Sequence, residues 1–472
     1  MESIKKSLDM RSVLLQELSK KIWDYSEVRF ETPKSAIALK AFLRSEGFTI
    51  ESPIADMEHA FIASYGTGET HIGLLAEYDA LENMSQCAQS YQPKPCENKT
   101  AGHGCGHNLL GVGSVAAALA VKDYLKENPH LGKVSVFGAP AEESGYGKAF
   151  MARAGCFNDL DIALTWHPYD LTAVWGERTL AVYQVYFKFN GKSAHASAAP
   201  ELGRSALDAA ELMNIGVNFL REHMDDVARV HYAFVNAGGN AANVVQSEAA
   251  LHYFIRHETT EKVDELYERV KKIAQGAALM TETELEIIWD SACADYLANK
   301  KLSELMYHHA QNIESAFDRQ DYKHAKKYLT KTIEPSFLDR LARYYPNKSY
   351  DELLKLAQTP INETIADFKI WDRGYASTDV GDVSWNVPTA QMFVTCEPHG
   401  TPMHSWQWVD NGTSAFAHKG MMRAAQIMAA TAIDVLKNPA LLLQIQEEFK
   451  VKTKGKPYQS AIPKDVLPKQ SL

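Results

Sequence analysis

Apolar residues near the start of the chain recur at the spacing of amphipathic helices. In the stretch 11–25 they recur at helical spacing, at Val13, Leu14, Leu18, Ile22 and Trp23. The stretch 35–44 repeats this spacing. Because residues three and four apart share one face of a helix, each stretch would bury one side. Two helices are therefore expected to open the fold.

Short apolar runs then alternate with helical stretches. The runs 72–75, 134–137 and 162–165 are typical of buried strands, and an Ala-rich helix is expected at 109–125. After a long interruption the alternation resumes, with a strand at 391–395 and a closing helix at 414–436. Such alternation predicts an α/β domain with a mostly parallel sheet covered by helices. This domain is split in the sequence.

The interrupting segment has a different order of elements. We predict a strand, a helix, two strands, a helix and a strand, at 182–189, 205–221, 229–235, 248–256, 260–279 and 284–289. This βαββαβ order is that of a ferredoxin-like domain. The expected organisation is a catalytic domain from 1–180 and 296–472, an inserted domain at 181–295, and a helical insertion at about 300–375 without obvious chemistry.

Composition narrows the classes of protein. A chain of 472 residues exceeds a single core, and a net charge of −10 argues against nucleic acid as a partner. The longest small and apolar run, 111–121, is too short for a membrane helix, and residues 1–10 lack the apolar centre of a secretory signal. Six scattered cysteines are typical of reduced thiols. We therefore expect a cytoplasmic protein that does not enter a membrane.

A glycine-rich motif supplies the first candidate metal ligands. Cys105 and His107 stand in Gly-His-Gly-Cys-Gly-His-Asn, at 102–108, just before the Ala-rich helix. A thiolate and an imidazole two residues apart can face one metal if the glycines keep the backbone tight. The alternative is a glycine-rich turn with a buried thiol, in which Asn108 caps the helix.

Acidic and histidine residues follow the predicted strands. Glu142 and Glu143 stand in Pro-Ala-Glu-Glu after 134–137, at a carboxyl end of the sheet, where α/β folds place ligands. One acid could bind metal while the other takes a proton from water, although paired acids are more often solvated surface. His167 ends its strand, which Pro168 is expected to stop. His404 lies in a loop after 391–395, where an ordinary loop histidine is the alternative.

Taken together, these segments predict a metal site. All lie at strand ends or in the loops beyond them, and they offer sulfur, nitrogen and oxygen ligands in a number suited to two ions: Cys105, His107, Glu143, His167 and His404. Glu142 remains as the base. Asp79 would suit a supporting role, accepting the free ring N–H of a ligating histidine. Glu77 and Asp79 could equally be plain loop acids.

The motifs resemble those of the M20 metallopeptidases and amidohydrolases over most of the chain. The resemblance rests on Cys-Gly-His at 105–107, Pro-Ala-Glu-Glu at 140–143, the strand end at His167, Gly-Lys-Ser-Ala-His-Ala-Ser at 191–197, and His404-Ser405. The stretches 377–385 and 387–389 are similar to a subgroup that acts on p-aminobenzoyl-glutamate. One departure is Asn-Leu-Leu at 108–110, where relatives often have Asp and a second His. We expect it to affect substrate class more than metal binding.

The resemblance implies two divalent metal ions per subunit, Zn²⁺ or Mn²⁺, with Cys105 bridging them and Glu142 activating a metal-bridging water. A single thiolate favours zinc. The inserted domain would act as a lid and form a homodimer or a heterodimer with a related subunit. From it, His195 would reach a neighbouring active site to stabilise the oxyanion. Asn243 and Arg256 would hold the substrate carboxylate and the polarised carbonyl.

The activity implied is hydrolysis of an amide bond in an N-acyl amino acid. The expected substrate is p-aminobenzoyl-glutamate, cleaved to p-aminobenzoate and glutamate. Two alternatives stay open. The chain could be a dipeptidase or an N-acyl amino acid deacylase of another specificity, or it could be a non-catalytic partner subunit of a heteromeric hydrolase. A complete ligand set argues against the last alternative, because an inactive partner has no physical need for it.

Overall fold

Two compact units divide the chain. The computed structural model describes residues 1–329, 335–370 and 374–469. Unit 1 comprises Met1–Glu177, the described residues of 297–371, and Val383–Pro457. Unit 2 comprises Arg178–Tyr296 and the described residues of 372–382 and 458–472. Two short segments that are distant in sequence from 178–296 thus belong to the same unit.

Unit 1 is built on a seven-stranded sheet in the order β1-β2-β4-β3-β5-β11-β6. Its strands are β1 Thr49–Glu51, β2 Phe61–Gly66, β3 Thr70–Glu77, β4 Gly132–Ala139, β5 Ile162–Tyr169, β6 Ala173–Val174 and β11 Thr389–Thr395. The central strands β4, β3, β5 and β11 pair in parallel, and β1, β2 and β6 add antiparallel pairs at the edges. The predicted α/β class with a mostly parallel sheet is confirmed.

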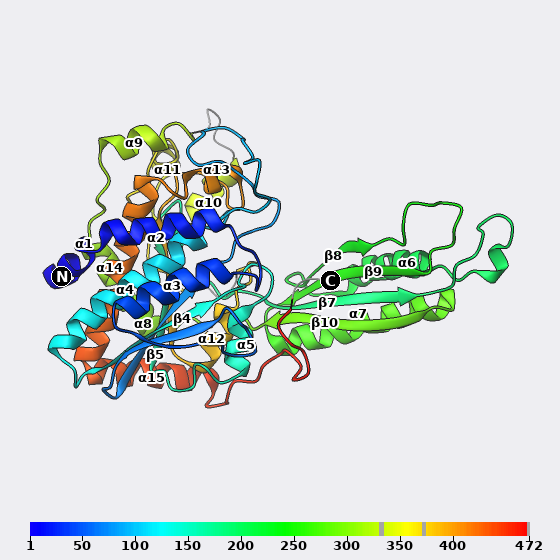
Figure 1. Cartoon of the computed structure of the whole chain (residues 1–472), viewed down its shortest axis with the longest axis horizontal. Helices are drawn as coiled ribbons and strands as arrows, with labels where there is room; N and C mark the ends of the chain where they lie inside the picture. The colour runs from blue at the N-terminus through cyan, green and yellow to red at the C-terminus, as the bar shows by residue number, and fades with distance from the viewer. Residues whose placement is uncertain (330–334, 371–373, 470–472) are drawn as a thin grey trace. The chain divides into compact units, whose positions relative to one another are not determined.

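Helices pack around this sheet (Figure 1). They are α1 Glu2–Asp9, α2 Ser12–Tyr25, α3 Pro33–Ser45, α4 His107–Glu127, α5 Gly147–Arg153, α8 Lys300–Asn312, α9 Arg319–Ala325, α10 Pro335–Tyr344, α11 Tyr350–Ala357, α13 Trp406–Asn411, α14 Ala415–Lys437 and α15 Pro439–Thr453. Of these, α3, α4, α8 and α14 make the main contacts with the strands. Helix α4 is almost wholly buried because its small residues allow close packing. A Cβ on Gly113 would lie only 2.6 Å from the Trp166 ring of β5.

The sequence pattern missed several elements and misjudged one strand end. Helices α1 and α15 and strands β1, β2 and β6 were not predicted, and the strands among them are short. The expectation that Pro168 stops its strand was wrong, because β5 continues to Tyr169 and Pro168 pairs with Val394 of β11. Strand β3 pairs with β5 only as far as Leu164, so the missing N–H of Pro168 costs no ladder bond on that side.

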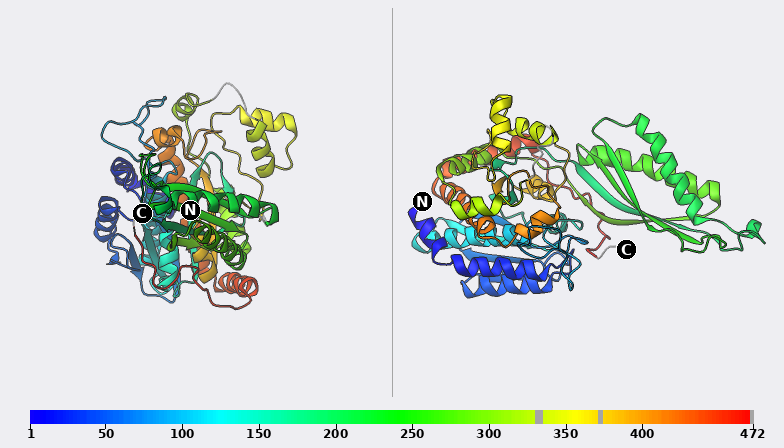
Figure 2. Two further views of the ribbon diagram at one scale, coloured as in Figure 1. Left: turned by 90° about the vertical axis from the view of Figure 1, so that its right-hand side faces the viewer. Right: turned by 90° about the horizontal axis from the view of Figure 1, so that it is seen from above.

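Unit 2 is a four-stranded antiparallel sheet in the order β10-β7-β9-β8. It contains β7 Ala181–Asn190, α6 Ala206–Leu220, β8 Arg229–Asn236, β9 Glu248–His257, α7 Thr260–Thr281 and β10 Glu284–Cys293, with 3₁₀ turns at Pro200–Leu202 and Arg221–His223. Both helices pack on one face of the sheet (Figure 2). The βαββαβ order is as predicted. Helix α12, Val380–Asn386, runs across the sequence boundary between the units.

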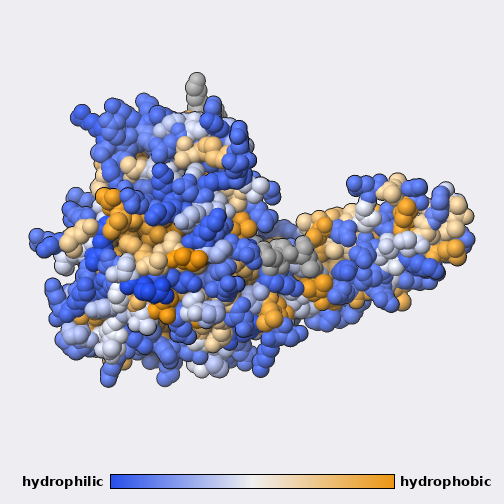
Figure 3. Space-filling view, in the orientation of Figure 1, coloured by the Kyte–Doolittle hydropathy of each residue, from blue (hydrophilic) through white to orange (hydrophobic). Residues whose placement is uncertain are grey.

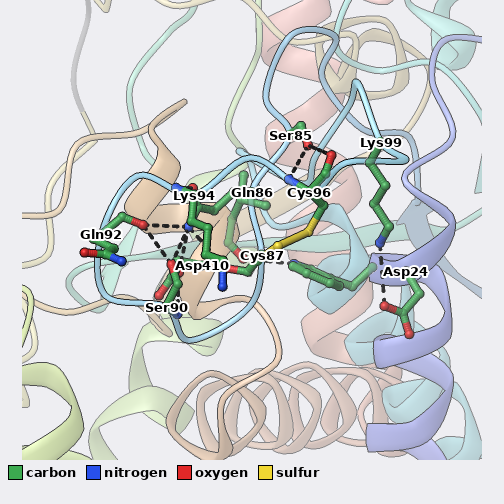
Figure 4. The surroundings of a disulfide bond; sticks show 12 residues. Asp24, Ser85, Gln86, Cys87, Ser90, Gln92, Lys94, Cys96, Lys99 and Asp410 are labelled. Atoms are coloured by element: carbon green, nitrogen blue, oxygen red, sulfur yellow. Dashed lines mark hydrogen bonds and ion pairs between the residues drawn. A yellow bond between two sulfur atoms is a disulfide. The ribbon is translucent and has the colours of Figure 1, made fainter.

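The loop before Cys105 contains a disulfide bond (Figure 4). Cys87 and Cys96 are joined, with Cα atoms 5.3 Å apart, so the expectation of reduced thiols was wrong for this pair. The loop folds back on itself, because the Cys87 N–H donates to the Lys94 carbonyl and the Cys96 N–H to Ser85 Oγ. The other four cysteines are free thiols. Since reduced thiols were one ground for it, the cytoplasmic location stays a prediction.

Among the helices that the structure describes, none combines the length and the apolar character needed to cross a bilayer.

Candidate metal centre

The candidate ligands gather at the carboxyl edge of the unit 1 sheet. Glu77 is the last residue of β3, Glu142 and Glu143 follow β4, and His167 lies near the end of β5. The parallel strands all end at the same edge, which brings these side chains together although they are far apart in the sequence. The loop after β11 adds His404, and the start of α4 adds Cys105 and His107.

Gly106 allows Cys105 and His107 to face the same point. It is the N-cap of α4 and has a left-handed backbone with φ +77°. A Cβ at this position would lie 3.0 Å from Pro168 Cγ and 3.2 Å from Trp408 Nε1, both tighter than an ordinary contact. A side chain at position 106 is therefore excluded both by the backbone conformation and by its neighbours. The turn therefore brings the thiol of Cys105 and the imidazole of His107, one on each side of Gly106, to the same side of the backbone.

The sulfur of Cys105 lies between two histidines. Cys105 Sγ is 3.4 Å from His167 Nε2 and 3.4 Å from His404 Nε2. Two sets of donor atoms, each within 4.8 Å of one another, include it: Cys105, His107 and His167, and Cys105, Glu143 and His404. Ligands of a tetrahedral ion lie about 2.0–2.3 Å from it, and so about 3.3–3.8 Å from one another. Three of the separations lie within this range: Cys105–His167 at 3.4 Å, Cys105–His404 at 3.4 Å and Glu143–His404 at 3.7 Å.

His107 and His167 are each oriented through Nδ1, which points away from the cluster and leaves Nε2 facing it. His107 Nδ1 lies 3.2 Å from Asp79 Oδ1 and 3.1 Å from the Asp79 carbonyl, so it donates there. His167 Nδ1 likewise donates to the Pro168 carbonyl at 2.9 Å. Asp79 also accepts the N–H of Glu143 at 3.0 Å. It therefore fixes the orientation of one candidate ligand and the backbone of another.

The cluster has buried polar atoms that make no hydrogen bond and could bind a cation. Among the described residues, neither His107 Nε2 nor Glu143 Oε1 makes a hydrogen bond, although both atoms are buried. Burial, reinforced by Asp79 and Glu77 and opposed by His107, raises the pKa of Glu143 to about 7. The pKa of His107 is raised well above its usual value, because hydrogen bonding to Asp79 and nearby negative groups outweigh burial. The site thus attracts positive charge.

The thiol and the second imidazole also suit a metal ion. Burial raises the pKa of the Cys105 thiol far above its usual value, and Glu143 adds to the effect. A divalent ion reverses this preference, because a coordinated thiol is deprotonated. Burial, with the nearby His107, lowers the pKa of His167 to about 4, so its ring is neutral at pH 7 and can act as a ligand. The donor set therefore fits divalent metal.

Glu142 is placed beside this set. Its Oε2 lies 3.9 Å from His107 Nε2, and its side chain is 13% exposed against 8% for Glu143. The two adjacent acids thus differ in surroundings, since Glu143 also approaches His404 Nε2, at 3.7 Å. This geometry leaves Glu142 the more accessible carboxylate at the edge of the cluster.

Glu77 is a site residue to which sequence reasoning gave no role. Its Oε2 lies 3.2 Å from His107 Nε2, and its Oε1 accepts a hydrogen bond of 2.7 Å from Lys148 of α5. Both side chains are buried. Burial alone would raise the pKa of Glu77, but Lys148 and the nearby histidines lower it, so the carboxylate is charged. The sequence signal that could have identified Glu77 as a site residue was its position at a strand end, two residues before Asp79.

Asn108 follows His107 in the first turn of α4. The side chain is fully buried and donates to Ser19 Oγ of α2 at 3.1 Å and to the Gly412 carbonyl at 3.0 Å. Asn108 therefore ties the first turn of α4 to its neighbours instead of joining the ligand set. The helix-capping alternative for Asn108 is wrong, because α4 already begins at His107.

The remaining predicted site residues, His195, Asn243 and Arg256, belong to unit 2. His195 Nδ1 accepts the N–H groups of Ser197 and Ala198, so its exposed ring carries the proton on Nε2 and can donate from there. The Asn243 carbonyl accepts the Ala196 N–H, which brings the His195 and Asn243 loops together.

Arg256 is already engaged within unit 2. It donates from Nη1 to Ser377 Oγ at 2.5 Å, and Ser377 Oγ in turn donates to the Leu180 carbonyl at 2.8 Å. The roles of His195, Asn243 and Arg256 at the metal centre stay predictions.

Comparison with known proteins gives the family. Residues 176–281 match the model of the peptidase dimerisation domain of M20 proteins. The chain is 44% identical to a p-aminobenzoyl-glutamate hydrolase subunit from Escherichia coli K12, over 96% of this chain and 95% of that protein. It is 28% identical to mouse Xaa-Arg dipeptidase, over 94% and 91% of the two chains.

Solved structures show the same fold. A dinuclear metal-binding peptidase of the M20 family from Bacillus subtilis superposes with a TM-score of 0.55 at 15% identity, over 91% of this chain and 99% of that one. The relative from Escherichia coli covers nearly the whole chain, and the site described above lies within that match. The chain therefore belongs to the M20 family of metal-dependent amide hydrolases.

Proposed function

We propose that this protein hydrolyses p-aminobenzoyl-glutamate to p-aminobenzoate and glutamate. The observation that carries the proposal is the 44% identity to a p-aminobenzoyl-glutamate hydrolase subunit, which extends over 96% of the chain. The chain also keeps a sulfur, nitrogen and oxygen donor set at the sheet edge. A catalytic role is the simplest reason to keep such a set together with a separate accessible carboxylate.

The metal site would be formed by Cys105, His107, Glu143, His167 and His404. Because Cys105 belongs to both donor sets, it would be shared by two ions. Such ions polarise an amide carbonyl and lower the pKa of water. The single thiolate favours zinc over manganese.

Side chains of this protein would carry out the proton transfers. Glu142 takes a proton from the attacking water on a carboxylate oxygen and passes it to the leaving amine. His195 donates from Nε2 to the developing oxyanion. Asn243 and Arg256 hold the substrate, because an amide and a planar guanidinium can meet a carbonyl and a carboxylate.

Hydrolysis by the purified chain alone tests the proposal. The metal-loaded protein is expected to release p-aminobenzoate from p-aminobenzoyl-glutamate, measured by liquid chromatography, and the same preparation stripped of metal serves as the blank. A panel with alanyl-arginine and N-acetyl-glutamate compares other substrates, because mouse Xaa-Arg dipeptidase is also similar over most of the chain. A preference for the dipeptide would favour that second activity. Activity only after addition of a homologous chain would identify a partner subunit.

We further propose that unit 2 forms a dimer through its edge strand β8, with a second copy or a related subunit. The domain matched at 176–281 is a dimerisation domain. Strand β8 is at the edge of its sheet, and Tyr232, Phe234 and Val235 on it are 38%, 43% and 43% exposed. An apolar edge strand is a template for pairing. Apolar side chains lie among polar ones on the visible face of unit 2 (Figure 3).

A double substitution on β8 tests this interface. Phe234→Lys with Val235→Lys is expected to weaken the dimer at least about tenfold, since charges on an edge strand oppose pairing. Sedimentation velocity over a range of concentrations measures the change. Leu279→Lys is the matched control, because Leu279 lies on α7 of the same unit and is 82% exposed. A doubly substituted protein that still sediments as the wild type would refute the interface.

A further inference from the structure

The candidate ligand His404 stands on a loop without regular structure. The loop runs from the end of β11 at Thr395 to the start of α13 at Trp406. His404 itself has a left-handed backbone with φ +53°, and its side chain is 51% exposed. Its N–H donates to the Gly104 carbonyl, beside Cys105. Such a ligand holds its place only if the rest of the loop is fixed from elsewhere.

Asp170 fixes the loop four residues before His404. This carboxylate is fully buried, and its Oδ2 accepts the Gly400 N–H at 2.8 Å. Gly400 has φ +82°, and a Cβ there would lie 3.2 Å from the Phe337 ring of α10. Asp170 also stands three residues after His167 at the end of β5. One carboxylate thus connects the strand of one candidate ligand to the loop of another.

Arg340 of α10 holds Asp170 in place. Arg340 Nη1 donates to Asp170 Oδ1 at 2.9 Å and Nη2 donates to Oδ2 at 2.5 Å, so the guanidinium and the carboxylate form a bidentate pair. Nη1 also donates to the Tyr169 hydroxyl at 2.8 Å. A pair of this kind orients its partner more strictly than a single contact. Arg340 therefore sets the direction in which Asp170 presents Oδ2 to Gly400.

The same helical segment holds the neighbouring residue His399. Its N–H donates to the Pro360 carbonyl at 3.0 Å, and its Nδ1 donates to the Leu356 carbonyl at 3.1 Å. Asn362 Nδ2 lies 3.3 Å from His399 Nε2 and donates to it. Every one of these partners belongs to the stretch from α11 to residue 362.

The far side of the loop is held from α9 and the turn after it. His324 Nε2 donates to Asn411 Oδ1 at 2.8 Å, and the Tyr328 hydroxyl donates to Asp410 Oδ2 at 2.5 Å. Asp410 and Asn411 are the last residues of α13, which begins two residues after His404. The described residues of 319–362 therefore contact the chain both before His404, in the loop, and after it, in α13.

We propose that the described part of the helical segment, from α9 to Tyr328 and from α10 to Asn362, positions His404 for metal binding, and that Arg340, acting through Asp170 and Gly400, is its main positioning residue. This inference rests on the proposed role of His404 as a ligand. It gives a function to a segment in which the sequence shows no chemistry. Arg340 donates its side-chain hydrogen bonds to Asp170 and Tyr169 rather than to a candidate ligand, so its loss should change how well one ion is held.

Calorimetric titration of Zn²⁺ into the metal-stripped full chain tests the inference. Arg340→Met is expected to weaken the more weakly held ion about tenfold, the low end of the effect of supporting groups on metal affinity. Arg343→Met is the matched control: it removes the same charge from the same helix at an exposed position and should bind zinc as the wild type does. Circular dichroism verifies the fold of each variant.

Repeating the measurement in the His404→Ala background shows whether Arg340 acts on zinc affinity through His404 or weakens the whole metal site. His404→Ala should itself lose the more weakly held ion, and Arg340→Met added to it should change the zinc affinity of the remaining ion less than twofold. An equal tenfold loss in both backgrounds would overturn the inference, as would unchanged zinc binding by folded Arg340→Met. Unchanged binding by His404→Ala would overturn the ligand assignment first and the inference with it.

A conservative variant covers the case in which Arg340→Met does not fold. Arg340→Lys keeps the positive charge beside the buried Asp170 but loses the two-pronged contact. It is expected to weaken the same ion about threefold, and this loss should disappear in the His404→Ala background. If Arg340→Met does not fold and folded Arg340→Lys binds zinc with wild-type affinity, the proposal is overturned.

Discussion

Glu142→Gln is expected to lower kcat about a thousandfold while bound metal stays at the wild-type level. A positioned general base contributes about 10²–10⁴ to a rate, and glutamine cannot accept the proton. Metal should be retained because Glu142 belongs to neither of the donor sets that include Cys105. It belongs to a third group of donors, with Glu77 and His107, which shares only His107 with the proposed ligands. Steady-state kinetics with p-aminobenzoyl-glutamate, with metal content by mass spectrometry on the same preparation, measures both quantities.

Glu143→Gln provides the contrast for that prediction. Glu143 is adjacent in sequence and equal in size, but its carboxylate is part of a donor set with Cys105 and His404. This variant should lose both activity and one ion. If Glu142→Gln kept more than a tenth of the wild-type kcat, or lost metal as Glu143→Gln does, its assignment as the base would be wrong.

Lys148→Met is expected to lower the free energy of unfolding by about 3–5 kcal/mol, because removing one partner of a buried ion pair leaves an uncompensated charge. Lys148 Nζ lies 2.7 Å from Glu77 Oε1, and the two side chains are 0% and 4% exposed. Urea unfolding of the metal-free protein, followed by circular dichroism, measures the change. The uncompensated charge would lie at the metal centre, because Glu77 also contacts His107.

A surface lysine is the control for this substitution. Lys126 lies 3.4 Å from Asp123 and its side chain is 51% exposed, so Lys126→Met should cost less than about 1 kcal/mol. Adding Glu77→Gln to Lys148→Met should restore part of the lost stability, since no net charge is then left buried. A loss below about 1 kcal/mol for Lys148→Met would show that Glu77 is compensated without Lys148.

Much of the fold and the candidate ligands could be predicted because both follow from local patterns. The parallel strands could be identified from short apolar runs, and a parallel sheet brings its carboxyl ends to one edge. Polar residues directly after those runs, such as Glu143 and His167, were therefore expected to meet. The same reasoning placed Asp79 near a ligating histidine, and it lies beside His107.

The contacts that could not be predicted join segments with no common pattern. Lys148 gives no sign in the sequence that it pairs with Glu77, 71 positions away. Asp170 and Arg340 are 170 positions apart. The disulfide between Cys87 and Cys96 forms in a loop without periodicity. Each of these contacts depends on the tertiary fold, which neither hydrophobic spacing nor composition predicts.

The left-handed backbone conformation of His404 lowers the stability of the protein, while the side chain at this position is a candidate metal ligand. A residue with a Cβ is disfavoured by about 1–2 kcal/mol in the left-handed conformation, and glycine would relieve that cost. Glycine has no imidazole, so the relief would remove the candidate ligand. A search for stabilising substitutions in this protein would accordingly reach position 404, and the more stable chain that it returned would lack one candidate metal ligand. His404 is the only one of the five candidate ligands with a positive φ, so selection for stability alone would remove this ligand first.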